Sequence, residues 1–154
     1  MKLKAEKIGL SLEIEDQLLN NMTENGKIYY PNEFGGFLFG YYTNNNKHLI
    51  ITDSVLPIKF KSSRYNFERS TEGIEDQLYK FHRESPSKFY IGEWHTHPDS
   101  NAIASIADIL AMRSIISTPN SCIKNPVLLI IGDSKSKVKF SFYVLYNYNL
   151  YKYE

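Results

Sequence analysis

The stretch GEWHTHPDSNAIASIAD, from Gly92 to Asp108, places two histidines one residue apart, ahead of a proline and a short polar loop. The residues that lead into the proline alternate as in a strand, where side chains at positions i and i+2 lie on the same face. His95 and His97 therefore point the same way, and their imidazoles can converge on one ion. Such a pair at the end of a strand favours a metal site over two solvated histidines.

A serine and an aspartate follow at the start of the next helical pattern. Ser105 and Asp108 are three residues apart and share one face of a helix, and seven residues between His97 and Ser105 let that helix end fold back over the strand. Two histidines and one aspartate form a three-ligand set, which leaves zinc a fourth position for water, as in catalytic sites. The same residues, 105–108, also fit a capping box, in which the serine caps the helix and the acid reaches back to the serine amide.

The stretch PNEFGGFLFGYY, from Pro31 to Tyr42, is unusual in a second way. Gly35 and Gly36 lie inside an apolar strand, where glycine weakens pairing unless the backbone passes close to something. Glu33 stands at the mouth of this strand and by itself indicates only a solvated charge. Beside a zinc site, a carboxylate that is not a ligand can serve as the base that a zinc hydrolase needs for its water.

Length and composition limit the possible classes of protein. A chain of 154 residues fits one domain, expected to span residues 1–154, and folds without a structural metal or disulfides. Its 18 basic and 17 acidic residues give a net charge of +1 with no block of like charge, which argues against nucleic-acid or membrane partners. A single cysteine, Cys122, and a polar N-terminal segment favour a cytoplasmic protein. We expect Cys122 to be a small, at least half-buried side chain.

Hydrophobic periodicity predicts the order of elements. A strand and a helix come first, followed by a hairpin, a second helix, a strand, a third helix and two final strands. This order predicts an α/β fold with a central mixed sheet flanked by helices. The expected segments are strand 8–12, helix 14–22, strands 34–42 and 49–56 joined by loop 43–46, helix 74–81 ending before Pro86, strand 89–97, helix 106–116 closed by Pro119, buried strand 127–131 and hairpin strand 138–148.

Together these motifs resemble the complete JAMM motif of the JAB/MPN metallopeptidases. The resemblance covers the core of the chain, from Glu33 to about Ile131, and its element order. The form GEWHTHP is similar to that of small bacterial members, because Trp94 directly precedes the first histidine and Thr96 replaces the common serine. Thr96 faces away from the ion, so this departure leaves the ligand set intact. The matching motif positions are EFGGFLFG at 33–40, HTHP at 95–98, Ser105 and Asp108.

The resemblance implies a single-domain JAB/MPN fold of the cytidine-deaminase-like type, and it assigns a role to each motif residue. One zinc ion (Zn2+) per chain is held by His95, His97 and Asp108. Glu33 takes a proton from the zinc-bound water and later delivers one to the leaving amine, while Ser105 helps to bind the oxyanion.

The resemblance also implies a reaction and its partners. Family members hydrolyse an isopeptide or peptide bond after the C-terminal glycine of ubiquitin or a ubiquitin-like modifier, in deconjugation or precursor processing. Small bacterial members accompany ubiquitin-like conjugation machinery, including the peptidase of cyclic-oligonucleotide (CBASS) anti-phage systems. The expected partners are therefore a ubiquitin-like modifier or its conjugate and E1-like and E2-like proteins.

Three other classes use part of the same pattern. A non-haem iron enzyme also binds its metal through two histidines and a carboxylate, but it needs neither Glu33 nor Ser105. A nucleobase deaminase requires a cysteine pair beside its zinc, and this chain has one cysteine. A non-catalytic MPN scaffold or binding module typically lacks part of the motif, whereas here all five positions are filled.

The segment that follows the third helix bears on the substrate. Only residues 118–126 separate that helix from the buried strand, so the long insertion that gives some relatives selectivity for a ubiquitin chain linkage is absent. Selectivity is then expected to come from the tail of the modifier. The strand 34–42 and the segment 60–67 are candidates for a groove that holds an extended tail by strand addition.

Overall fold

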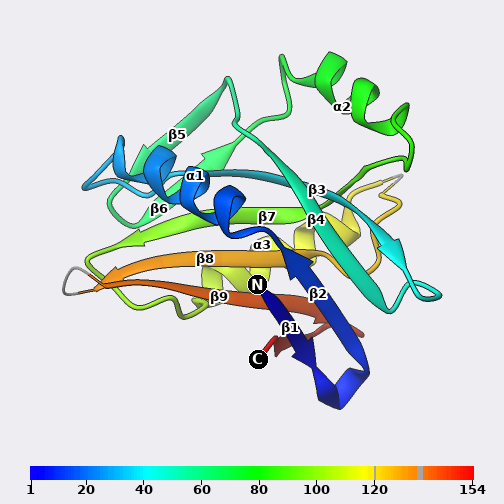
Figure 1. Cartoon of the computed structure of the whole chain (residues 1–154). Helices are drawn as coiled ribbons and strands as arrows, with labels where there is room; N and C mark the ends of the chain where they lie inside the picture. Colours follow the sequence, from blue (N-terminus) through cyan, green and yellow to red (C-terminus); the bar gives the residue numbers. More distant parts are fainter. Residues whose placement is uncertain (120, 135–136) are drawn as a thin grey trace.

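A mixed sheet forms the centre of the structure, a computed structural model that describes residues 1–119, 121–134 and 137–154. Within these residues the sheet has eight strands in the order β1-β2-β4-β3-β7-β8-β9-β10, and β5 and β6 form a separate hairpin (Figure 1). The strands are β1 (Lys2–Ala5), β2 (Leu10–Ile14), β3 (Gly35–Thr43), β4 (His48–Val55), β5 (Phe60–Ser63), β6 (Asn66–Arg69), β7 (Phe89–Pro98), β8 (Val127–Ser134), β9 (Lys137–Tyr146) and β10 (Asn149–Lys152).

Helices cover both faces of this sheet. The helices are η1 (Glu6–Ile8), α1 (Asp16–Lys27), α2 (Glu75–His82) and α3 (Ile106–Ser117), and α1 and α3 lie on opposite sides of the sheet (Figure 1). On β8, Leu129 packs in the cluster that holds Met22 of α1, while Leu128 and Ile130 pack with Met112 of α3. Both faces of β8 are buried in this way, which explains its unbroken apolar run.

The predicted α/β fold with a mixed sheet and flanking helices is confirmed. The strand and helix order from residue 8 onward matches the expected order, although the first helix begins at Asp16, because Ile14 completes β2. The prediction omitted β1, the β5–β6 hairpin and β10. Among the residues that the structure describes, no helix is long and apolar enough to cross a membrane.

The glycine pair at the start of β3 is explained by the sheet itself. A Cβ on Gly35 would lie 2.0 Å from the carbonyl oxygen of Trp94, and one on Gly36 would lie 2.5 Å from that of Val55. The expected close approach is therefore correct, but it involves neighbouring strands. Because β3 pairs with β4 on one edge and with β7 on the other, the expectation that strand 34–42 adds a substrate strand is wrong.

The two ends of the sheet meet. Lys4 and Glu154 exchange both backbone hydrogen bonds, at 2.7 and 2.8 Å, which joins the β1 edge to the segment after β10. The termini accordingly lie close together in Figure 1. The expectation for Cys122 is wrong, since its side chain is exposed in the segment before β8.

Candidate metal centre

The alternation of β7 separates the two candidate ligand side chains from the core. Trp94 is fully buried with α1 on one face, and Thr96 exchanges hydrogen bonds with the backbone of Phe34. His95 and His97 lie on the other face, and their Nε2 atoms are 3.0 Å apart. The strand therefore delivers both imidazoles to one point, as their spacing predicts.

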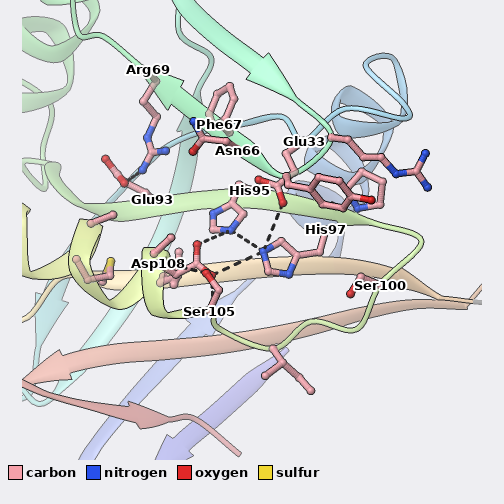
Figure 2. Close-up of a pocket in the computed structure, with 18 residues that line it drawn as sticks. Glu33, Asn66, Phe67, Arg69, Glu93, His95, His97, Ser100, Ser105 and Asp108 are labelled. Atoms are coloured by element: carbon pink, nitrogen blue, oxygen red, sulfur yellow. Dashed lines mark hydrogen bonds and ion pairs between the residues drawn. The ribbon is translucent and has the colours of Figure 1, made fainter.

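Asp108 reaches the same point from the first turn of α3. Its Oδ1 lies 3.1 Å from His95 Nε2, and its Oδ2 lies 3.7 Å from His97 Nε2. One ligand atom from each of the three residues lies within 4.8 Å of the others. Figure 2 shows the three side chains turned toward one another between the strand and the helix.

The chemistry of this donor set fits a metal ion. Two ring nitrogens and a carboxylate oxygen converge, and each carries a lone pair that repels its neighbours unless a cation or proton lies between them. Burial, followed by the charge of His95, lowers the pKa of His97 and favours the neutral imidazole that ligates metals. For Asp108, burial opposes ionisation, but contacts with His95 and hydrogen bonds from Ser105 outweigh it and lower the pKa.

Ser105 is part of a capping box in this structure. Its hydroxyl and its backbone N–H both donate to Asp108 Oδ2 at 2.6 Å, and the Asp108 backbone N–H donates back to Ser105 Oγ at 3.2 Å. The capping interpretation is therefore confirmed. Ser105 also lines the pocket over the three converging side chains.

Glu33 lies beside the three converging residues but outside their cluster. Its Oε1 is 4.0 Å from His97 Nε2, a separation that one water molecule can bridge. Burial, with a smaller effect of the Asp108 charge, raises the pKa of Glu33 to about 7. A carboxyl with this pKa can both accept and donate a proton near neutral pH.

A pocket of about 410 Å³ opens over these residues. The β5–β6 hairpin forms its roof, with Asn66 and Phe67 of β6 opposite the histidines (Figure 2). β5 is joined to the segment just before β3, because the Glu33 N–H donates to the carbonyl of Ser63 at 2.8 Å. The expected tail segment, 60–67, therefore does border the site.

One pair in the pocket wall was missed by sequence reasoning. Arg69 of β6 forms an ion pair with Glu93 of β7, and Tyr90 donates to Glu93 at 3.1 Å. Both charged side chains are only 12% exposed. Glu93 lies two residues before His95, so the alternation of the strand could have placed its side chain on the same face as the histidines. Nothing in the sequence indicates that Arg69 is its partner.

A mixed sheet that presents two histidines of one strand to an aspartate of the next helix defines an α/β protein whose donor set is compatible with a metal ion. A family described as prokaryotic homologs of the JAB domain matches residues 15–145. The chain belongs to this family of prokaryotic JAB/MPN metallopeptidases.

Individual relatives agree with this family. A CD-NTase/cGAS isopeptidase of Enterobacter hormaechei is 30% identical over 102 residues, 66% of this chain and 56% of that protein. This chain thus matches little more than half the length of that relative. A probable metalloprotease, y4qB of Sinorhizobium fredii, is 25% identical over 120 residues, 77% of this chain and 73% of that protein.

A solved structure shares the fold. The solution structure of protein DSY2949 from Desulfitobacterium hafniense superimposes with a TM-score of 0.62 and covers 92% of this chain and 88% of its own, at 16% identity.

Proposed function

We propose that this protein is a zinc metallopeptidase that hydrolyses the peptide or isopeptide bond after the C-terminal glycine of a ubiquitin-like modifier. The observation that carries the proposal is the convergence of His95, His97 and Asp108 beside a separate carboxylate, Glu33, under the β5–β6 hairpin. The names of the isopeptidase and metalloprotease relatives support the same reaction class.

The positions of the motif residues support a role for each of them. His95, His97 and Asp108 hold the metal. A zinc ion in such a site lowers the pKa of a water and polarises a carbonyl. Glu33 accepts the proton of the attacking water and delivers a proton to the nitrogen of the leaving amine, because it faces the pocket without being a ligand. Ser105 lies on the helix side, where its hydroxyl stabilises the oxyanion or orients Asp108.

Among the described residues β6 pairs with β5 alone, and its other edge supplies a binding strand for the modifier tail. Ser70 N donates to Lys59 O, so antiparallel alternation directs the N–H and C=O groups of Phe67 and Arg69 away from β5, toward the pocket. An extended tail that pairs with this edge is held by main-chain hydrogen bonds and delivers its last carbonyl to the histidines.

The partner we propose is a ubiquitin-like modifier or its conjugate, with E1-like and E2-like proteins acting in the same cytoplasmic system. The relative named for a CD-NTase/cGAS isopeptidase supports a role in anti-phage defence.

The decisive test uses a modifier joined to a reporter through its terminal glycine. We expect cleavage after the glycine, loss of cleavage with a chelator and recovery with zinc. Glu33→Gln keeps the shape and removes the proton acceptor, so turnover falls about a hundredfold or more while zinc content stays near wild type. Glu15→Gln, an exposed change just before α1, is the control and keeps full activity. Loss of zinc from the Glu33→Gln protein would show that Glu33 is a metal ligand, which contradicts the mechanism.

A second experiment tests which side of the bond is recognised. One modifier is joined to two unrelated partners, once through a lysine side chain and once as a fused peptide. We expect similar kcat/KM values, because the groove described above holds only the tail. A strong dependence on the partner, together with tolerance of a bulky residue in place of the terminal glycine, contradicts the proposal.

A further inference from the structure

Glu33 lies just outside the strand ladder that follows it in the chain. The ladder between β3 and β7 begins with Gly35 opposite His95, so Glu33 stands two residues before it. Its side chain nevertheless extends over the candidate ligands toward His97 (Figure 2). Catalytic groups must be held within about 0.5 Å of their reactive position. A long, flexible carboxylate in this place therefore needs its backbone fixed by contacts other than the ladder.

The β5–β6 hairpin provides these contacts on both sides of Glu33. The Glu33 N–H donates to the carbonyl of Ser63 at 2.8 Å, and the hydroxyl of Ser62 donates to the Glu33 carbonyl at 2.5 Å. The first bond uses the main chain of β5 and does not depend on the side chain at position 63. The second bond depends on a side chain, so a substitution of Ser62 can release the backbone of Glu33.

The next residue is held from another direction, by the strand that carries the two histidines. The Phe34 N–H donates to Thr96 Oγ1 at 3.0 Å, and the Thr96 N–H donates to the Phe34 carbonyl at 2.8 Å. Thr96 stands between His95 and His97 in the chain. The backbone of Glu33 and Phe34 therefore bridges β5 and β7, with Phe34 fixed to β7 and Glu33 fixed to β5.

We propose that Ser62 is a positioning residue, whose hydroxyl fixes the backbone of Glu33 and so holds the Glu33 carboxyl 4.0 Å from His97. The proposal rests on the proposed function, because it concerns the group assigned there to proton transfer. Ser62 belongs to no position of the motif and does not line the metal pocket. Loss of its hydroxyl leaves the candidate ligands and the binding edge of β6 in place, so turnover is the quantity that it changes.

The kinetic test compares substitutions of Ser62 on a modifier fusion. For Ser62→Ala we expect kcat to fall about tenfold to a hundredfold, because a displacement of about 1 Å can have an effect of this order, while KM and zinc content stay at their wild-type values. Ser62→Thr keeps the hydroxyl and restores most of kcat, whereas the isosteric Ser62→Val does not. Ser87→Ala is the matched control and keeps the wild-type kcat, because the hydroxyl that it removes donates to the His82 carbonyl in the connection between α2 and β7.

A double variant tests whether Ser62 acts through Glu33. Once Glu33→Gln has removed the proton acceptor, loss of the Ser62 hydroxyl has no carboxylate left to displace. We therefore expect the kcat of the double variant Glu33→Gln, Ser62→Ala to equal that of Glu33→Gln. If Ser62→Ala lowers kcat by the same factor in both backgrounds, the two residues act independently, which overturns the proposal.

Hydrogen exchange in EDTA gives a readout that needs neither zinc nor turnover. The Glu33 N–H is bonded to β5, whereas the Ser70 N–H is bonded to the Lys59 carbonyl and joins the two ends of the hairpin. We expect Ser62→Ala to speed exchange of the Glu33 amide about tenfold, while the Ser70 amide exchanges at the wild-type rate. Faster exchange of both amides together with a raised KM means that the whole hairpin has loosened, which overturns the positioning role.

These readouts distinguish the positioning role from the proposed function. If the wild-type protein with zinc cleaves no fusion, but Ser62→Ala speeds exchange at Glu33 and not at Ser70, Ser62 fixes Glu33 as proposed and the peptidase is contradicted. If fusions are cleaved and the kcat of Ser62→Ala equals that of wild type, the positioning role is overturned and the peptidase is left intact.

Discussion

Asp108 uses its two carboxylate oxygens for different partners. Oδ1 lies nearest His95, while Oδ2 accepts both hydrogen bonds of Ser105. Hydrogen bonds of this kind fix the orientation of a metal ligand, and their loss typically lowers metal affinity tenfold to a hundredfold. The serine that caps α3 therefore also fixes the orientation of the aspartate beside His95.

Ser105→Ala should weaken zinc binding as well as turnover. We expect the dissociation constant for zinc to rise about tenfold, because one of the two hydrogen bonds to Oδ2 is lost, and the free energy of unfolding to fall by about 1 kcal/mol, because the helix loses its cap. Competition with a zinc-binding dye measures the first and urea unfolding the second. If turnover falls while zinc affinity is unchanged, the Ser105 hydroxyl stabilises the oxyanion and does not support the metal ligand.

Removal of a proposed metal ligand should lower the zinc content more than removal of the Ser105 hydroxyl, which only orients Asp108. His97→Ala leaves only His95 of β7 and Asp108 of α3 as ligands. We therefore expect the zinc content after dialysis, measured by elemental analysis, to fall below about a tenth of the wild-type value. Full zinc occupancy in this variant contradicts the ligand assignment.

Glu33 should make the metal-free protein less stable as the pH rises. The pKa of Glu33 is raised from 4.5 to about 7, so between these values the folded protein holds a proton that the unfolded chain has lost. The free energy of unfolding therefore falls from pH 5 to pH 8 and levels off above the folded pKa. A shift of this size corresponds to at most about 3 kcal/mol, and partial solvent access reduces the expected loss to about 1–2 kcal/mol.

The measurement is urea unfolding in EDTA at pH 5 and pH 8. Glu33→Gln lacks the titrating group. Its free energy of unfolding should therefore rise, relative to that of wild type, by about 1–2 kcal/mol between pH 5 and pH 8. The exposed Glu68→Gln should follow the wild-type profile. Parallel profiles for wild type and Glu33→Gln disprove the raised pKa.

At the scale of single elements, the β5–β6 hairpin is held by its neighbours more than by its own sequence. Ser62 donates to the Glu33 carbonyl at 2.5 Å, and Arg69 pairs with Glu93 on β7. Phe60 and Phe67 pack edge-on or tilted against Phe34. These partners are distant in the sequence, and a four-residue strand has too short a pattern to be predicted alone. By contrast, the convergence of His95 and His97 could be predicted because the strand period fixes their relative positions locally, and the seven residues before Ser105 allow Asp108 to reach them.

Breaking the Arg69–Glu93 pair should loosen the hairpin. Glu93→Gln leaves a guanidinium with little solvent access and no countercharge, and we expect a loss of about 3 kcal/mol in the free energy of unfolding. The double variant Arg69→Leu, Glu93→Leu should recover most of it, because neither side then buries a charge. Glu72→Gln, which breaks the exposed pair with Lys59, should cost less than about 1 kcal/mol. Equal losses in the single and double variants contradict a buried ion pair.

At the scale of the whole molecule, the strand order places the strand that carries His95 and His97 in the interior of the sheet. β7 lies between β3 and β8, so both candidate ligands come from a strand that is paired on both edges. The sequence predicts the number and type of the central elements, because their apolar periods are local. It does not predict the strand order or the meeting of β1 with the segment after β10, because those depend on pairings between residues far apart in the chain, such as Lys4 and Glu154.

The junction between the two sheet ends should contribute to global stability without contributing to the metal centre. Tyr153 is 4% exposed, packs in the same core cluster as Leu12 and Phe142, and donates its backbone N–H to Phe142 at 2.9 Å. Replacing a buried aromatic side chain by alanine typically costs about 3–5 kcal/mol, so Tyr153→Ala should lower the free energy of unfolding by that amount. The exposed Tyr148→Ala is the matched control and should stay within about 0.5 kcal/mol of wild type. Because the proposed zinc ligands belong to β7 and α3, the zinc content per folded Tyr153→Ala molecule should equal that of wild type. Zinc lost from the folded variant in parallel with stability would mean that the sheet junction and the metal centre are coupled.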